Sequence, residues 1–139
     1  GVQIHLTSDS LCCKEFSNEL PTKVRPINQI PEDEMGLDIG PESIKAFNEV
    51  IVNSSLILWN GPMGVFEMSN FQNGTGSIAH SIVKATENNA FSLIGGGDSV
   101  AAINLFKLGS KVSHVSTGGG AMLEYLEGKQ LPGIEAINN

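Results

Sequence analysis

The chain has 139 residues, 40% of them hydrophobic, which is enough apolar material for the core of one domain. Its 8 basic and 15 acidic side chains give a net charge of −7, which argues against nucleic acid as a partner. No apolar run is long enough to cross a membrane and no signal peptide pattern begins the chain, so we expect a soluble cytoplasmic protein without membrane contact. Cys12 and Cys13 are adjacent, which suits neither an ordinary disulfide nor a metal site and agrees with a reducing compartment.

The first part of the chain predicts few regular elements. Residues 2–6 alternate between apolar and polar types, which predicts a strand in progress and hence a start inside a longer protein. Residues 9–31 contain three prolines and mixed charges, and they predict a loop with a short strand near Val24. Residues 36–40 predict a turn or short strand, and Pro41 then opens a helix with its apolar side chains on one face.

From residue 56 onward, strand and helix patterns alternate. The expected elements are a strand at 56–59 buried on both faces, a helix from Ile78 to 87 after punctuation at 73–77, a strand at 91–94, a helix at 99–108, a strand at 112–116 and a helix at 121–126 capped by Gly128. The short connections favour right-handed crossovers between parallel strands. The sequence therefore predicts an α/β fold, a partial Rossmann-like three-layer α/β/α arrangement with a mainly parallel sheet.

Two glycine triplets, at residues 95–97 and 118–120, each follow a predicted strand and precede a predicted helix. Glycine removes every Cβ and permits positive φ, so an anion can approach the main chain closely. The helix that begins there offers free N–H groups and the positive end of its dipole. Since ligands in parallel sheets bind at the carboxyl ends of the strands, the two loops predict a polyphosphate site. The alternative is a pair of purely structural tight turns.

Five side chains near these loops can serve either chemistry or structure. Asp98 either caps a helix or ligates a hard cation such as Mg²⁺, and Ser99 either caps or donates its hydroxyl to a phosphate. Asn60 can donate its amide to a phosphate or form an ordinary turn, and Thr117 can bind phosphate or merely close a strand. Glu67 can accept hydrogen bonds from ribose or remain a solvated carboxylate. The dinucleotide fingerprint and the P-loop are both absent, and no basic residue lies in either triplet.

Five segments stand out together: GLDIGPES at 36–43, LWNGPMGVFE at 58–67, GGGDS at 95–99, HVSTGGG at 114–120 and LEGKQLPG at 126–133. In this order and spacing they resemble the phosphoglycerate kinase family over nearly the full length of the chain. The resemblance implies that residues 1–139 are the later part of the C-terminal nucleotide-binding domain of a two-domain kinase, with a C-terminal tail from about 128.

The resemblance also implies roles for individual residues. Gly36 would border the adenine, Pro62 would lie near the sugar, Glu67 would hold the ribose, and Asn60 would lie near the phosphates. Asp98 would ligate Mg²⁺ and Ser99 would touch the phosphate chain. The catalytic groups that it implies are backbone amides, which would stabilise the transferred phosphoryl group. They belong to Gly96, Gly97, Gly119 and Gly120. The amides of Gly96 and Gly97 would also bind the nucleotide.

The implied reaction is reversible phosphoryl transfer between 1,3-bisphosphoglycerate and ADP, giving 3-phosphoglycerate and ATP in glycolysis. Amides and Mg²⁺ can supply much of the charge stabilisation that this transfer needs, which accounts for the absence of bases near the triplets. In the family, the basic residues for phosphoglycerate lie in the N-terminal domain, and the transfer lysine lies earlier in the C-terminal domain. The resemblance therefore implies a monomeric complete enzyme, with the N-terminal domain as the partner of this domain, and no turnover by these 139 residues alone.

Departures from the family pattern affect two side chains near the triplets. Ser99 stands where threonine is usual, and Met122 replaces a usual serine beside the transfer site. Residues 6–9 are also less apolar than is usual, so the first strand is expected to end differently.

Two other classes of function remain open from the residues alone. A flavodoxin-like cofactor-binding module also places phosphate loops at strand ends. It needs aromatic side chains against the flavin, and the chain has one Trp, one Tyr and six Phe. The other class is a structural fragment without ligand affinity, since a severed parallel sheet leaves an unpaired edge.

Overall fold

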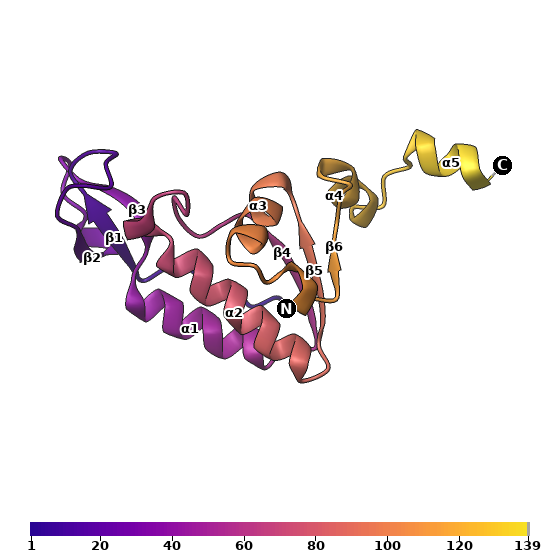
Figure 1. Cartoon of the computed structure of the whole chain (residues 1–139), viewed down its shortest axis with the longest axis horizontal. Coiled ribbons are helices and arrows are strands. Elements are labelled where there is room, and N and C mark those ends of the chain that lie inside the picture. The colour runs from indigo at the N-terminus through magenta and orange to yellow at the C-terminus, as the bar shows by residue number, and fades with distance from the viewer. Residues whose placement is uncertain (139) are drawn as a thin grey trace.

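The computed structural model describes residues 1–138 and has a mixed α/β fold with two separate sheets (Figure 1). The first half of the chain comprises β1 (Asp9–Cys13), β2 (Lys23–Pro26), η1 (Ile27–Gln29), β3 (Met35–Ile39), α1 (Pro41–Val52) and β4 (Leu56–Asn60). The second half comprises η2 (Ser69–Phe71), α2 (Asn73–Glu87), β5 (Phe91–Gly95), α3 (Gly97–Leu105), η3 (Gly109–Lys111), β6 (His114–Val115), α4 (Gly120–Leu126) and α5 (Pro132–Asn138).

Sheet A has the strand order β2-β1-β3, and both of its strand pairs are antiparallel. The register between β1 and β3 shifts between Leu11 and Cys12, which marks an irregularity in the ladder. The Arg25 guanidinium on β2 makes two hydrogen bonds of 2.8 and 2.7 Å with the Glu34 carboxylate just before β3. This bidentate ion pair links the two outer strands of the sheet.

Helix α1 starts on a carboxylate supplied by sheet A. Asp9 accepts hydrogen bonds from the backbone N–H groups of Glu42 (3.0 Å) and Ser43 (2.8 Å) and from the Ser43 hydroxyl (2.6 Å). Burial alone would raise the pKa of Asp9, but these hydrogen bonds from Ser43 and Glu42 outweigh it and hold the pKa below its ordinary value. An anion at the first turn also complements the helix dipole, so Asp9 fixes where α1 begins.

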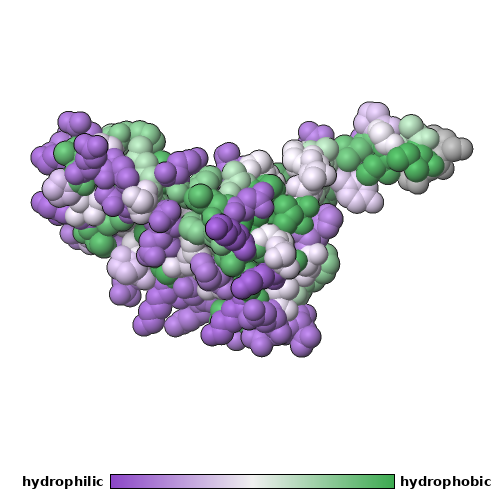
Figure 2. All heavy atoms as spheres, in the orientation of Figure 1, coloured by the Kyte–Doolittle hydropathy of each residue, from purple (hydrophilic) through white to green (hydrophobic). Residues whose placement is uncertain are grey.

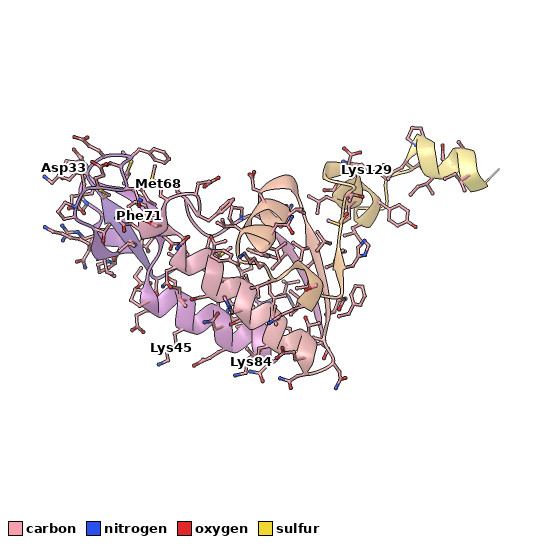
Figure 3. All side chains as sticks on the ribbon, in the orientation of Figure 1. Asp33, Lys45, Met68, Phe71, Lys84 and Lys129 are labelled. Carbon is pink, nitrogen blue, oxygen red and sulfur yellow. The ribbon has the colours of Figure 1, made fainter. Side chains whose placement is uncertain are left out.

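Sheet B has the order β4-β5-β6 with all strands parallel, as the sequence predicts for a Rossmann-like fold. One continuous core lies between this sheet and the helices, with fully buried side chains such as Ile94 and Ile103. A smaller core of Cys13, Leu37 and Phe71 lies beside sheet A. Figure 3 shows Phe71 and Met68 at that end of the molecule, where Met68 packs against the smaller core.

Two predictions for the first part of the chain are wrong. Residues 2–6 form no strand, and Val2 is 91% exposed. The expected loop at 9–31 instead contains β1 and β2, since Leu11 and Cys13 fill the space beside Leu37 and Phe71. The short strand predicted near Val24 is confirmed as β2.

Two predictions for the later elements also need correction. Strand β4 is not buried on both faces: Ile57 and Trp59 are buried, whereas Leu56 and Leu58 are exposed. The reason is that α2 and α3 cover one face of sheet B, and in the described residues little covers the other. Helix α2 begins at Asn73 instead of after Ser77, because its first turn packs its glycines against β3 and Phe106.

The C-terminal part extends away from the two sheets (Figure 1). Gly128 follows α4 with φ of +82°, the left-handed conformation expected of a glycine that ends a helix. Helix α5 lies beyond it, and the space-filling view shows hydrophobic residues exposed there (Figure 2), among them Ile137 with 85% of its surface accessible. None of the described helices combines the length and apolarity needed to span a bilayer.

Candidate nucleotide-binding site

The glycine-containing loops all leave the carboxyl edge of sheet B. Asn60 at the end of β4 is in register with Gly95 at the end of β5, and Ile94 is in register with Val115 on β6. The next link is a 2.8 Å hydrogen bond from the Ser116 N–H to the Ile94 carbonyl. The two triplets therefore follow neighbouring parallel strands, as the sequence predicts.

A hollow of about 450 Å³ opens beside these loops. It is lined by Phe16, Pro62, Gly64, Val65, Phe66, Glu67, Met68 and Asp98. Three residues predicted from the sequence thus share one concave surface, although Pro62 and Glu67 come from the loop after β4 and Asp98 comes from the start of α3. The carboxylates of Glu67 and Asp98 are both exposed, so each is accessible to a ligand.

The first triplet forms the turn between β5 and α3. Gly96 has φ of +84°, and a Cβ at this position would collide with the Asn60 carboxamide. Asn60 therefore lies directly against Gly96. Helix α3 begins at Gly97, where an added Cβ would meet no atom within 4 Å. The N–H groups of its first turn have no partner within the helix, and Asp98 is the acidic residue of that turn.

Ser99 faces the interior of the chain. Its side chain is fully buried, and its hydroxyl accepts a 2.6 Å hydrogen bond from the backbone N–H of Gly61. Ser99 therefore ties the loop after β4 to the start of α3, which the sequence did not reveal. In this arrangement the group that Ser99 presents at the helix start is its backbone N–H.

The loop that carries Glu67 is fixed from beneath by Thr75 and Asp38. The fully buried Thr75 hydroxyl accepts hydrogen bonds from the N–H groups of Met63 (3.0 Å) and Gly64 (3.3 Å). The Asp38 carboxylate contacts the Gly64 backbone and accepts a 2.7 Å hydrogen bond from the Gly74 N–H. Burial raises the pKa of Asp38, although the hydrogen bonds from Gly74 and Ile39 act in the opposite direction. A further 2.8 Å bond joins the Val65 N–H to the Leu37 carbonyl on β3.

Phe16 is the functional candidate that sequence reasoning missed. It lies in the connection between β1 and β2, and 61% of its surface is exposed although it is aromatic. Its ring lines the hollow opposite residues of the Glu67 loop. An exposed aromatic side chain in a cavity wall suits stacking against a planar ligand. The available signal was a single Phe within a charged, polar segment, which is weak without the fold.

Gly36 lies outside this hollow. It lines a neighbouring one of about 270 Å³, whose wall is partly formed by Gly64 and Val65, residues that also line the first hollow. The loop at 64–65 therefore separates Gly36 from Glu67. The structure brings Gly36 near the predicted site but does not place it in the same concavity.

The second triplet also lies outside the lining of the hollow. Gly119 has φ of +52° and precedes the short helix α4. Met122 on that helix lies beside Gly118, and its thioether methyl fills the space that a Cβ at Gly95 would occupy. The side chain that departs from the family pattern is therefore packed against sheet B, close to Leu58.

The described residues contain no cluster of three or more His, Cys, Asp or Glu side chains that could hold a metal ion by themselves. Asp98 nevertheless fits one form of cation binding. Mg²⁺ is commonly held by one or two carboxylates together with substrate phosphates and water. The exposed Asp98 carboxylate would supply the protein ligand of that set, and the free N–H groups of the same helix start could hold the phosphates.

A larger hollow of about 630 Å³ lies along α1 and α2. Its lining includes Asn48, His80, Lys84 and Phe106 but none of the residues predicted to bind nucleotide. The His80 ring is already hydrogen-bonded to the Gly76 carbonyl at 2.7 Å. The smaller hollow at the sheet edge is therefore the better candidate site.

Known proteins resemble this chain in sequence and in fold. The sequence profile of the family described as phosphoglycerate kinase matches residues 1–129. The chain is 56% identical to the phosphoglycerate kinase of Porphyromonas gingivalis over 137 residues, which cover 99% of this chain and 33% of that protein. It is 50% identical to the enzyme of Chloroherpeton thalassium, covering 100% of this chain and 35% of that protein.

A solved structure of phosphoglycerate kinase from Coxiella burnetii superposes with a TM-score of 0.87 at 39% identity, covering 94% of this chain and 33% of that one. The enzyme of Pyrococcus horikoshii superposes with a TM-score of 0.79 at 29% identity, covering 95% and 32%. The chain thus spans about a third of the length of the relatives that it matches. On the profile match, the sequence identities and the shared fold, this chain belongs to the phosphoglycerate kinase family.

Proposed function

We propose that this chain supplies the nucleotide-binding part of a kinase that transfers a phosphoryl group between 1,3-bisphosphoglycerate and ADP. The observation that carries the proposal is the hollow lined by Pro62, Glu67 and Asp98, with Phe16 as its aromatic wall. It combines an apolar surface for a base, an acceptor for ribose hydroxyls and a carboxylate for a cation. Family membership supports the same reading.

In this proposal the nucleotide extends from Phe16 to the start of α3. The Phe16 ring contacts the base, Glu67 accepts hydrogen bonds from the ribose hydroxyls, and Pro62 lies beside the sugar. Gly36 lines the neighbouring hollow behind the loop at 64–65, so it borders the adenine only across that loop. Asn60 donates its amide to the phosphates, because its carboxamide lies against Gly96 at the helix start.

The phosphates meet the first turn of α3. The N–H groups of Gly97, Asp98 and Ser99 have no partner within the helix. They lie at the positive end of the helix dipole, where an anion binds favourably. Asp98 would hold Mg²⁺, which would offset the negative charge of the phosphates. This neutralisation is needed because the two carboxylates that line the hollow, Glu67 and Asp98, would otherwise repel a polyphosphate.

The transfer step needs no side chain that acts as a base. A terminal oxygen of ADP attacks the phosphorus of the acyl phosphate, a new P–O bond forms, and the bond from phosphorus to the carboxylate oxygen breaks. The 3-phosphoglycerate carboxylate leaves without requiring a proton. The amides of Gly96 and Gly97 and those of Gly119 and Gly120 stabilise the charge on the transferred group, as positioned dipoles do in other phosphoryl transfers.

We further propose that residues 1–139 form the later part of a C-terminal nucleotide-binding domain with a tail from about 128, in a monomeric cytoplasmic enzyme whose N-terminal domain binds phosphoglycerate. No lysine or arginine lines the hollow among the described residues. A polypeptide of these 139 residues alone is therefore expected to form no ATP from 1,3-bisphosphoglycerate and ADP. Measurable ATP formation by that polypeptide would contradict this part of the proposal.

Titration calorimetry with ADP, in the presence and absence of Mg²⁺, tests the binding roles in the protein at its full natural length. Asp98→Asn should weaken ADP binding about tenfold or more with Mg²⁺ and have little effect without it, because the carboxylate acts through the metal. Asp33→Asn is the matched control, since Asp33 is an exposed acid that pairs with Lys14 and does not line the hollow. An equal loss for Asp98→Asn with and without Mg²⁺ would refute the metal-binding role.

A further inference from the structure

The two walls of the hollow come from segments that are distant in the sequence. Phe16 lies in the connection between β1 and β2, whereas Glu67 and Met68 lie in the loop after β4. The width of the hollow therefore depends on what holds these two loops together. Figure 3 shows Met68 and Phe71 at the end of the molecule where sheet A lies. The loop after β4 therefore reaches sheet A, whose strands β1 and β2 flank Phe16.

Asn18 joins the two walls by direct hydrogen bonds. Its side-chain amide donates to the Ser69 hydroxyl at 2.9 Å, and its side-chain oxygen accepts from the Asn70 N–H at 2.9 Å. The Asn70 amide returns a 2.6 Å hydrogen bond to the Asn18 carbonyl. Because a backbone N–H can only donate, the orientation of the Asn18 amide is fixed by these contacts.

These contacts, which we call the Asn18 clasp, lie within two residues of each wall. Asn18 follows Phe16 by two positions, and Ser69 follows Glu67 by two positions. The local bonds of the Phe16 loop, from Ser17 to Glu15 and from Glu19 to Ser17, shape the loop but do not attach it to the opposite wall. Phe16 itself is mostly exposed, so packing alone does not fix its position.

We infer that Asn18 is a positioning residue for the base-binding end of the hollow, because its hydrogen bonds to Ser69 and Asn70 set the spacing between Phe16 and Glu67. This inference rests on the proposed function. Asn18 does not line the hollow and acts through Phe16 and Glu67. Its loss frees the aromatic wall, so that binding must also order the loop. The phosphate end, formed by α3 and Asn60, does not depend on the clasp.

The test compares two ligands in the full-length protein: ADP with Mg²⁺, which uses the base and ribose, and tripolyphosphate with Mg²⁺, which uses only the phosphate end. Asn18→Ala should weaken ADP binding about fivefold, as expected for loss of exposed hydrogen bonds that preorganise a loop. It should leave tripolyphosphate binding unchanged, and in turnover it should raise KM for ADP with kcat unchanged. Asn28→Ala is the matched control, because Asn28 is an exposed asparagine in η1 that makes no side-chain hydrogen bond within residues 1–138.

Asn70→Ala provides a second route to the same contact. If both residues act through the clasp, the double variant Asn18→Ala/Asn70→Ala should weaken ADP binding no more than the stronger single change. Unchanged ADP binding in Asn18→Ala, or an equal loss for ADP and tripolyphosphate, would overturn the inference while leaving the proposed function intact. If the unaltered protein binds neither ligand, the proposed function fails, and the inference fails with it.

Discussion

Gly97 separates the demands of the fold from the demands of the ligand. An added Cβ at Gly97 meets no atom within 4 Å. Gly97 is the first residue of α3, and its φ is not positive. The fold therefore does not require glycine there. In our account the nucleotide phosphates require it, because they approach the main chain at this helix start.

Gly97→Ala should consequently leave the free energy of unfolding unchanged or raise it by about 0.5 kcal/mol, since alanine reduces the entropy of the unfolded chain. The same methyl group should weaken ADP binding about tenfold, which corresponds to about 1.4 kcal/mol, by standing where a phosphate oxygen lies. Gly96→Ala is the informative contrast. Its φ of +84° and the adjacent Asn60 carboxamide predict a loss of stability of about 1 kcal/mol or more.

Urea denaturation and ADP calorimetry on both variants in the full-length protein provide the two readouts. Our reasoning requires that stability and affinity respond separately in Gly97→Ala. If Gly97→Ala binds ADP as tightly as the unaltered protein does, the anion does not contact this helix start. If Gly97→Ala loses stability instead, the conclusion that the fold leaves open space for a Cβ at Gly97 is wrong.

Three further changes test the supports of the site. Thr75→Val should cost about 2 kcal/mol of stability, because it leaves the Met63 and Gly64 N–H groups without their acceptor. Thr75→Ser keeps the hydroxyl and should cost about 1 kcal/mol. Equal urea midpoints for the two variants would contradict the role given to the hydroxyl. Gly64→Ala should cost about 2 kcal/mol or more, since its Cβ would lie 2.7 Å from the Asp38 Cα, and thermal unfolding against Gly133→Ala, where the space is open, measures the difference. Asp9→Ala should destabilise by about 2 kcal/mol near neutral pH. Because the folded pKa of Asp9 is lowered from 3.8, this difference should persist above that value and disappear as the pH falls through the folded pKa; a difference that grows in acid would reverse the sign of the argument.

The parallel half of the fold could be predicted because its signals are local. The apolar run at 91–94 predicts a strand, and the proline at the start of α1 predicts a helix, each without information from the rest of the chain. Short connections then restrict how neighbouring strands pair. Sheet A could not be predicted in this way. Strand β1 is specified by Leu11 and Cys13, which pack against residues far along the chain such as Phe71. Its antiparallel pairing with β3 has no signature in a segment rich in proline and charge.

The site followed the same division. Asn60, Glu67 and Asp98 stand next to glycine loops, so their position at a sheet edge follows from the order of the elements. Phe16 belongs to the site through a contact between segments about fifty residues apart, and no local pattern encodes that contact. The sequence likewise leaves capping and phosphate contact open for the Ser99 hydroxyl, because its partner Gly61 becomes visible only in the fold.

The most direct measurement of the central claim is a crystal structure of the full-length protein with ADP and Mg²⁺. We predict the base against Phe16, the ribose hydroxyls at the Glu67 carboxylate, and the phosphates at the first turn of α3 with Mg²⁺ on Asp98. Nucleotide bound instead in the larger hollow beside His80 and Lys84, with the hollow at Glu67 filled only by water, would contradict the account.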